Sequence, residues 1–454
     1  MFYFKQSLLP LFCLFLLTLG CKKEQTTTTI SNSALDTEID ELLNLASNNQ
    51  GRAYFTLPES DDYLKIPNDP NNPITEEKVV LGKLLYHETG LAINPKNPIS
   101  KNTYSCASCH FASAGFQAGR FQGIAEGGIG FGINGEGRMR GSLYEGDSLD
   151  VQPIRSPTTL HVAYQKVMLW NGQFGATGLN ANTDDAWVYG TPIETNYLGF
   201  EGTETQAIAG LKIHRMGMEE NFLTTYGYKP LFNAAFPTIP EEERYNSEQA
   251  GLAIAAYERT LLANQSPFQK WLKGDDNAMT QTEKEGAILF FGKAECVNCH
   301  TGPALNKMDF SALGMMDLVQ VSHESFKISM TDKERLGRAG FTGKAKDMYK
   351  FKIPQLYNLK DSPFYGHGSS LYTIRDVVSY KNEAIKENAA VPDANLDPDF
   401  KPLGLTNAEV LLITDFIKNG LYDNNLNRYI PERVLSGYCF PFNDPLAKNQ
   451  MGCD

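Results

Sequence analysis

Two short cysteine motifs are the part of this sequence with the clearest chemistry. The pattern C-x-x-C-H occurs at residues 106–110 (CASCH) and again at residues 296–300 (CVNCH). Two thiols three residues apart can add to the two vinyl groups of a haem, and the histidine that follows can ligate the iron. A zinc site would need four clustered ligands, and a redox dithiol needs no histidine after it. The repeated motif therefore predicts two covalently bound haem c groups. The attaching cysteines would be Cys106, Cys109, Cys296 and Cys299, and the iron ligands would be His110 and His300.

The first residues of the chain indicate export. Lys5 precedes an apolar run from Leu8 to Leu19, and a glycine then precedes Cys21. This is the pattern of a secretory signal, and it is too short to span a membrane. Residues 1–20 are predicted to be a signal peptide of the bacterial lipoprotein type, with a lipid on Cys21. Ordinary signal cleavage is the alternative, because Thr18 is not the usual aliphatic residue. The expected location is the periplasm or the outer membrane.

Composition limits the remaining possibilities. With 454 residues, of which 42% are hydrophobic and 21% charged, the chain is long enough for about two or three globular domains. A formal net charge of −12 argues against nucleic acid as a partner, and it suits a basic redox protein or simply solubility. Cys439 and Cys453 are the cysteines left after the haem, signal and lipid positions are assigned. In an oxidising compartment they are predicted to form a disulfide.

The elements that must position these motifs are predicted to be helices. Apolar residues recur at helical spacing, and Thr280 with Glu283 forms a capping box ahead of the second motif. The glycine-rich stretch 123–141 lacks the strand and helix of a dinucleotide site, so it is interpreted as a haem-covering loop. The fold class is therefore mainly α, with two cytochrome c-like haem domains and long loops. The expected helices fall near residues 36–43, 76–86, 204–218, 248–263, 280–291, 371–382 and 406–421.

The chain resembles the bacterial di-haem cytochrome c peroxidase family and its relatives, the methylamine dehydrogenase maturation oxidases. The resemblance runs from about Val79 to Leu421. It implies a substrate haem on the N-terminal domain, an electron-supplying haem on the C-terminal domain, and reduction of hydrogen peroxide to water. Many family members also hold calcium between the domains. The segments that carry the resemblance are Leu81–Tyr86, Pro157-Thr158, Leu169–Gly172, Tyr257–Thr260, Ser266–Phe268, Gly337-Arg338, Phe351–Asn358 and Pro363-Phe364.

The resemblance assigns roles to three side chains near the first haem. Trp170 lies in the family's Trp-x-Gly segment, where an aromatic ring bridges the haems, although a large core residue is the alternative. Gln206 matches the family's distal glutamine. Where the family has its acid-base glutamate, this chain has Met216, so His214 is the histidine nearest that position. His214 is predicted to be the acid-base residue, with an iron ligand or a helix-surface histidine as alternatives.

The iron ligands depart from the family pattern. Residues 111–160 contain no histidine, whereas the family's removable distal histidine follows the first motif. A closed resting state of that kind is therefore not expected. For the second haem, Tyr380 occupies the sixth-ligand position if the count starts at Pro363, and Lys381 if it starts at Thr373. Since neither is methionine, oxygen or nitrogen ligation is predicted.

The remaining histidines and the domain limits complete the expectations. His87, His161 and His323 are expected to be structural, and His367 to line the second haem. The protein is predicted to be a di-haem peroxidase that takes electrons from a small redox protein. An oxidase acting on a protein substrate is one alternative, and a non-catalytic electron-transfer or sensing lipoprotein is another. The expected domains are a signal peptide (1–20), a tether with an N-terminal segment (21–60), the substrate haem domain (61–275), the electron-transfer haem domain (276–430) and a tail (431–454).

Overall fold

The computed structural model describes Met1 and residues 32–453, so the predicted signal cleavage site and Cys21 lie outside the described residues. Helices dominate, which confirms the predicted fold class. No helix in the described part of the chain is both long and apolar enough to cross a membrane.

The helices and strands have the following bounds. The first helices are α1 (Asn32–Ala46), α2 (Arg52–Phe55), α3 (Glu76–His87), α4 (Gly202–Ile213), α5 (Glu220–Thr225), α6 (Tyr228–Ala235) and α7 (Glu241–Arg244). They are followed by α8 (Ser247–Arg259), α9 (Pro267–Leu272), α10 (Gln281–Phe291), α11 (Arg338–Thr342), α12 (Ile374–Glu383), α13 (Asn407–Asp415) and α14 (Pro445–Met451). Two antiparallel pairs of short strands are β1 (Gly128–Ile129) with β2 (Met139–Arg140), and β3 (Phe310–Ser311) with β4 (Phe351–Lys352).

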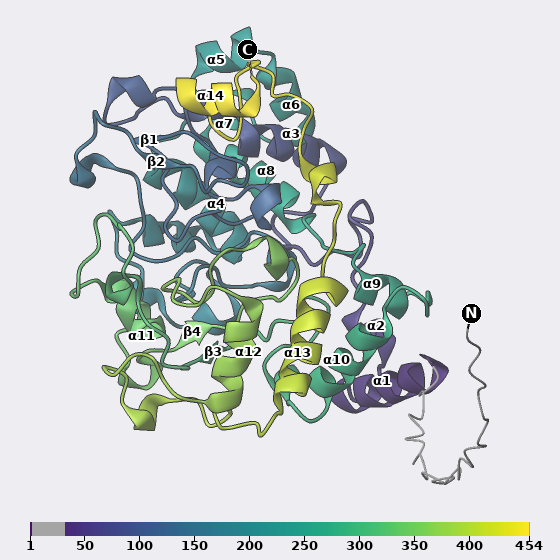
Figure 1. Ribbon diagram of the computed structural model, residues 1–454. Helices are drawn as coiled ribbons and strands as arrows, with labels where there is room; N and C mark the ends of the chain where they lie inside the picture. The colour runs from purple at the N-terminus through teal and green to yellow at the C-terminus, as the bar shows by residue number, and fades with distance from the viewer. Residues whose placement is uncertain (2–31, 454) are drawn as a thin grey trace.

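One half of the molecule, the upper half in Figure 1, is built around α3, α4 and α8. The helices approach closely because glycines stand at the contacts. A Cβ added to Gly82 would lie 1.9 Å from the Ala253 carbonyl oxygen, and one added to Gly251 would lie 2.5 Å from Ile208 Cγ1. The Cys106 and Cys109 side chains pack against this core, so the first motif belongs to this half.

The other half is built around α10, α12 and α13. Three threonines set the starts of these helices. Each of α10, α12 and α13 begins with a capping box at Thr280, Thr373 and Thr406. The threonine backbone N–H donates to the side chain of the third helical residue. The capping box expected at Thr280 is confirmed. Cys296 follows α10 and packs against this core, which places the second motif in this half.

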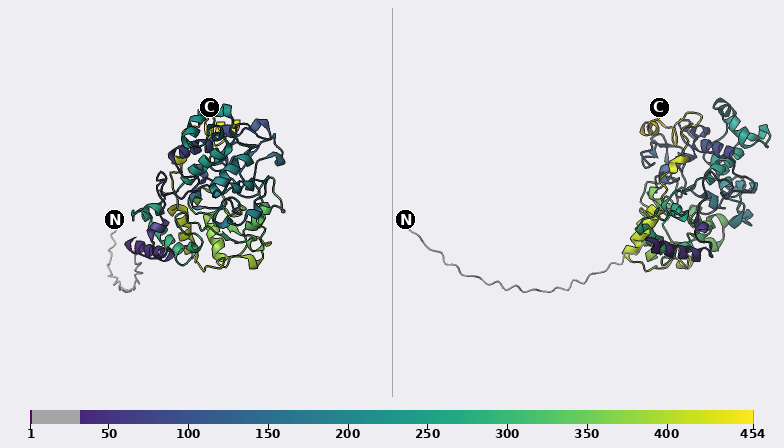
Figure 2. Two further views of the ribbon diagram at one scale, coloured as in Figure 1. Left: turned by 180° about the vertical axis from the view of Figure 1, so that it is seen from behind. Right: turned by 90° about the vertical axis from the view of Figure 1, so that its right-hand side faces the viewer.

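The two ends of the chain lie on opposite halves. Helix α1 packs on α10 in the second half, where Asp36 accepts from Trp271 Nε1 at 2.7 Å and pairs with Lys284 at 2.6 Å. Figure 1 and both views of Figure 2 show α1 at one end of the molecule and the C-terminal residues at the other. The described part of segment 21–60 thus contributes to the core of the C-terminal half.

The C-terminal tail crosses onto the N-terminal half and covers its motif. Ser108, inside the first motif, donates to the Pro441 carbonyl oxygen at 2.6 Å. Asp444 forms a buried ion pair with Arg138 at 2.5 Å. The predicted disulfide between Cys439 and Cys453 is confirmed.

Candidate haem sites

Each cysteine motif forms a single 3₁₀ turn, at Cys106–Ser108 and at Cys296–Asn298. One turn brings both thiols of a motif to the same side, as attachment to one ring requires. All four motif cysteines are free thiols and are partly exposed. Both turns therefore fit the attachment chemistry predicted from their spacing.

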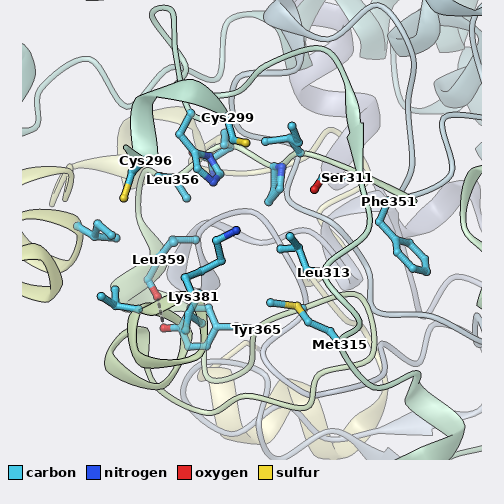
Figure 3. A pocket seen from close by; sticks show the side chains of 18 of the residues that line it. Cys296, Cys299, Ser311, Leu313, Met315, Phe351, Leu356, Leu359, Tyr365 and Lys381 are labelled. Atoms are coloured by element: carbon cyan, nitrogen blue, oxygen red, sulfur yellow. Dashed lines mark hydrogen bonds between the residues drawn. The ribbon is translucent and has the colours of Figure 1, made fainter. Parts of the chain in front are cut away.

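A cavity of about 250 Å³ lies at the second motif (Figure 3). Cys296, Cys299 and His300 line it together with mainly aliphatic side chains. His300 Nδ1 lies 3.1 Å from the Leu305 carbonyl oxygen, which can accept a hydrogen bond from it. This bond fixes the ring and leaves Nε2 as the coordinating nitrogen. An apolar space with paired thiols and an oriented imidazole fits a haem.

The proximal residue of the first motif is His110, in the N-terminal half. Tyr86 donates its hydroxyl to the His110 carbonyl oxygen at 2.7 Å, which anchors the backbone of the proximal residue. Burial, followed by the charge of His214, lowers the pKa of His110 to about 4. The imidazole is therefore neutral at pH 7, which is the form that binds a metal.

Helix α4 presents three residues on one face. Gln206, Gly210 and His214 are spaced four residues apart, so they share that face. All three are partly exposed, whereas Ala209 and Leu211 beside them on the helix are buried. A Cβ on Gly210 would contact only Gln206 Nε2, at 3.5 Å, so the face is open between the two polar side chains. The structure thus places Gln206 and His214 on the same face of α4, eight residues apart along the chain.

His214 is held by a carboxylate. It follows the last residue of α4, and its Nδ1 lies 2.8 Å from Asp150 Oδ2. The His214 carbonyl oxygen accepts a hydrogen bond from the Tyr104 hydroxyl at 2.8 Å. Tyr104 lies two residues before Cys106. Burial works against the charged imidazole, but the Asp150 charge and hydrogen bond outweigh it and raise the pKa of His214. About 33% of the His214 side chain is exposed, so the ring can reach a ligand.

Trp170 lies where the two halves meet. Its Nε1 donates to the Arg155 carbonyl oxygen at 2.8 Å, and its own carbonyl oxygen accepts from the Lys352 amide at 2.8 Å. Arg155 and Trp170 both line the cavity of the second motif. Ser156, which follows Arg155 in the chain, faces the first motif. A Cβ added to Gly123 would lie 2.9 Å from both Ser156 Oγ and Cys109 Sγ. The segment that holds Trp170 therefore separates the two motifs.

The two candidate sixth ligands at the second motif point in different directions. The Tyr380 hydroxyl donates to the Leu313 carbonyl oxygen at 2.6 Å, and its ring packs on Phe400 with centroids 5.2 Å apart. Tyr380 is absent from the cavity lining, whereas Lys381 belongs to it. Figure 3 shows Lys381 extending into the cavity with its nitrogen leading.

The other histidines are placed as expected. His87 is buried, with Nδ1 2.8 Å from the Lys83 carbonyl oxygen. His161 is also buried, and its Nε2 accepts from the Ala263 amide at 2.8 Å. His323 stacks on Phe121. His367 lines the second cavity, with Nε2 3.1 Å from Asp317 Oδ1.

Sequence reasoning missed two residues of these sites. Asp150, the partner of His214, lies beyond the glycine-rich loop, and no spacing rule links residues so far apart in the chain. Met315 lines the second cavity and carries a possible sulfur ligand, but its segment resembles no family motif. Among residues 32–453, no group of three or more His, Cys, Asp or Glu side chains could hold a metal ion. Calcium remains a prediction from the resemblance.

Comparison with known proteins assigns the chain. The family model described as di-haem cytochrome c peroxidase matches residues 76–277. Cytochrome-c peroxidase IdrP1 of Denitromonas iodatirespirans is 28% identical over 374 residues, which cover 78% of this chain and 84% of that protein. Methylamine utilization protein MauG of Methylorubrum extorquens is 26% identical over 332 residues, covering 72% and 74%.

A solved structure shares the fold. It is the crystal structure of a MauG-like protein associated with microbial copper homeostasis, with a TM-score of 0.54, 22% identity, and coverage of 82% of this chain and 95% of that one. The family and the named relatives imply two haem groups. Residues 76–277 thus match the di-haem cytochrome c peroxidase family, and the names of the family and of the relatives indicate a cytochrome c peroxidase-type oxidoreductase.

Proposed function

We propose that this protein is an exported di-haem c-type peroxidase that reduces hydrogen peroxide to water. The N-terminal haem is the peroxide site, and the C-terminal haem receives electrons from a small redox protein. The observation that carries the proposal is the face of α4, which presents Gln206 and His214 together near the first motif. A held histidine beside an amide is suited to acid-base chemistry on a small polar substrate.

The cofactors in this proposal are two haem c groups. Cys106 and Cys109 hold the first with His110 on its iron, and the second motif holds the other in the same way. When bound, the haem supplies the redox iron at which the O–O bond is cleaved. Denatured protein should keep two covalent haems, measured by mass and by haem-stained gels. Cys106→Ala should remove one thioether link from the first haem only. A wild-type protein that releases either haem on denaturation would contradict c-type attachment.

His214 moves protons at the peroxide site. Because Asp150 accepts from Nδ1, the proton that can be exchanged with a substrate is the one on Nε2. The same carboxylate stabilises the imidazolium that forms when Nε2 takes a proton. Gln206 offers an amide donor and an amide oxygen on the same helix face, so it can orient a peroxide molecule.

Electrons pass from the second haem to the first through the segment that separates them. Trp170 lies against the second cavity and is bonded to Arg155, next to Ser156 at the first motif. The net charge of −12 favours a donor protein with a basic surface. The N-terminal sequence supports export, with lipid attachment at Cys21 as the expected anchor.

Substitution of His214 tests the proposal. His214→Ala should slow peroxide turnover by about 10²- to 10⁴-fold with a small-molecule reductant, because the proton-transfer group is lost. Asp150→Asn should act in the same direction, since the ring loses the carboxylate charge that stabilises the imidazolium. Both haem spectra should stay near those of wild type. Lys212→Ala is the matched control, because Lys212 lies on the same helix but pairs with Glu194 at 2.6 Å on the surface.

Two other outcomes would change the assignment of His214. If His214 closes the first iron as a ligand, His214→Ala should turn that haem high-spin and raise its reactivity with peroxide. An unchanged rate together with an unchanged spectrum would return His214 to a structural role.

A further inference from the structure

Helix α12 carries an inward-facing stripe that ends in a lysine. Thr373 caps the helix, and Val377, Val378 and Lys381 line the second cavity. Lys381 lies four residues after Val377 and three after Val378, so all three side chains lie on the same face of the helix. Tyr380 lies between them on another face, and its hydroxyl is already bonded to Leu313. The helix therefore offers the cavity an amine and not a phenol.

The Lys381 ammonium has no protein partner in the part of the chain that the structure describes. No hydrogen bond or ion pair there includes its Nζ, which lies 5.3 Å from the centre of the Phe400 ring. By contrast, Lys386, five residues on, pairs with Asp393 at 2.6 Å. Leu313 and other aliphatic side chains line the cavity with Lys381, and Asp399 also lines it without forming an ion pair with the ammonium.

The amine also lies close to the haem-binding residues. Burial raises the pKa of both Cys296 and Cys299, and the Lys381 charge is the next largest influence on each thiol, lowering its pKa. Burial lowers the pKa of His300, the backbone hydrogen bond to Leu305 raises it, and the Lys381 charge lowers it further. Figure 3 shows the Lys381 nitrogen in the cavity that Cys296 and Cys299 line. A partner placed between His300 and Lys381 would satisfy both nitrogens.

We propose that Lys381 supplies the sixth ligand of the second haem through its neutral amine. On binding, the ammonium releases one proton to water, and the nitrogen lone pair forms the bond to iron without any change in oxidation state. The proposal rests on the proposed haem at the second motif, and it holds whether or not peroxide is the substrate. Ligation by two nitrogens favours the ferric iron more than ligation by histidine and methionine does, so this haem has a lower potential than a methionine-ligated one.

Two competing arrangements give the same cavity contacts. Lys381 could instead pair as an ammonium with a haem carboxylate, which requires its charge but not its lone pair. Met315 also lines the cavity and could supply a sulfur ligand. Lys381→Arg distinguishes iron ligation from pairing with a haem carboxylate, because the guanidinium stays charged and cannot give up a proton to bind iron. Lys381→Met tests the alternative of a sulfur ligand, because it introduces a thioether at the proposed ligand position and so shows what sulfur ligation looks like.

The experiment compares ferric holoprotein by near-infrared absorption and electron paramagnetic resonance in five forms. They are wild type, Lys381→Met, Lys381→Arg, Tyr380→Phe and Met315→Leu. Covalent haem content and far-ultraviolet circular dichroism are recorded for each, so that a misfolded variant is recognised. Because Lys381 and Met315 line the second cavity and Tyr380 neighbours Lys381 on α12, the difference spectra report on the second haem.

The expected results are specific. Wild type shows a low-spin second haem without a sulfur-to-iron charge-transfer band. Lys381→Met gains that band and raises the reduction potential, Lys381→Arg becomes high-spin, and Tyr380→Phe and Met315→Leu match wild type. A sulfur band in wild type that Met315→Leu abolishes would overturn the proposal, as would a Lys381→Arg spectrum identical to wild type. Wild-type protein without a haem on Cys296 and Cys299 would overturn the proposed function itself.

Discussion

At the scale of single residues, burial rather than sequence position sets the chemistry of Lys352. Its side chain lies in the core beside the second cavity, and Nζ donates to Gln165 Oε1 at 2.5 Å. Burial lowers the pKa of Lys352 to about 8 from the ordinary value of 10.5. Between these two values the unfolded chain holds a proton that the folded protein has released. The free energy of unfolding should therefore rise with pH across this window.

Lys352→Met should remove that rise. Below the window the buried ammonium destabilises the folded state by up to about 3 kcal/mol, so the variant should gain part of this amount near neutral pH. Urea midpoints measured below, within and above the window test the slope. Lys346→Met, at an exposed position in the same region, is the control and should keep the wild-type slope. Parallel pH curves for Lys352→Met and wild type would show that Lys352 stays charged in the fold.

The proposed attachment residues could be read from the sequence more directly than the residues around them. C-x-x-C-H spacing is a local property of one turn, so Cys106 to His110 could be recognised without the fold. The pairing of His214 with Asp150 depends on a long glycine-rich excursion that carries no periodic signal. A count along α12 could not separate Tyr380 from Lys381, because adjacent residues on a helix face different directions and only the packed neighbours decide between them.

At the scale of elements, glycines in two packed helices should respond in opposite ways to the same added methyl group. On Gly210 in α4 the methyl meets only Gln206 Nε2 at 3.5 Å, while on Gly251 in α8 it lies 2.5 Å from Ile208 Cγ1 and 2.8 Å from the Ile208 backbone. Gly210→Ala should raise the free energy of unfolding by up to about 1 kcal/mol, because alanine favours the helix. Gly251→Ala should lower it by about 1–3 kcal/mol through overpacking.

Chemical denaturation of the two variants measures this difference. Circular dichroism confirms that each retains its helices before unfolding. Equal losses for both variants would mean that the face of α4 is filled in the folded protein, and would remove the open site between Gln206 and His214.

The start of α10 was predictable from its threonine cap, whereas the end of α4 was not. A capping threonine marks the start of each of α10, α12 and α13. Helix α4 was expected to reach residue 218 but ends at Ile213, because Arg215 adopts a positive φ of 56° and turns the chain. Apolar periodicity continued past that point, so only the backbone shows the end.

At the scale of the whole molecule, each half contains a segment from the far end of the chain. Helix α1 packs in the C-terminal half, and the C-terminal tail packs on the N-terminal half. The tail depends on the ion pair between Arg138 and Asp444, whose side chains are 2% and 6% exposed. Asp444→Asn keeps the shape and the cap of α14 but leaves the Arg138 charge unpaired. The free energy of unfolding should fall by about 3–5 kcal/mol.

The control is the same substitution at a surface pair. Asp393 is 86% exposed and pairs with Lys386 at 2.6 Å, so Asp393→Asn should change the free energy of unfolding by less than about 1 kcal/mol. Thermal unfolding followed by circular dichroism gives both values. A loss for Asp444→Asn no larger than that of Asp393→Asn would show that the tail is loosely held.

The path of the tail sets an order of events during maturation. The residues that cover the first motif, around Pro441, are synthesised after both motifs. On the proposed c-type attachment, a haem can reach Cys106 and Cys109 while this surface is still bare. The bond between Cys439 and Cys453 then closes the segment that bonds to Ser108. Because this contact holds the tail against the first motif, we expect haem delivery to Cys106 and Cys109 to be easier before the tail closes.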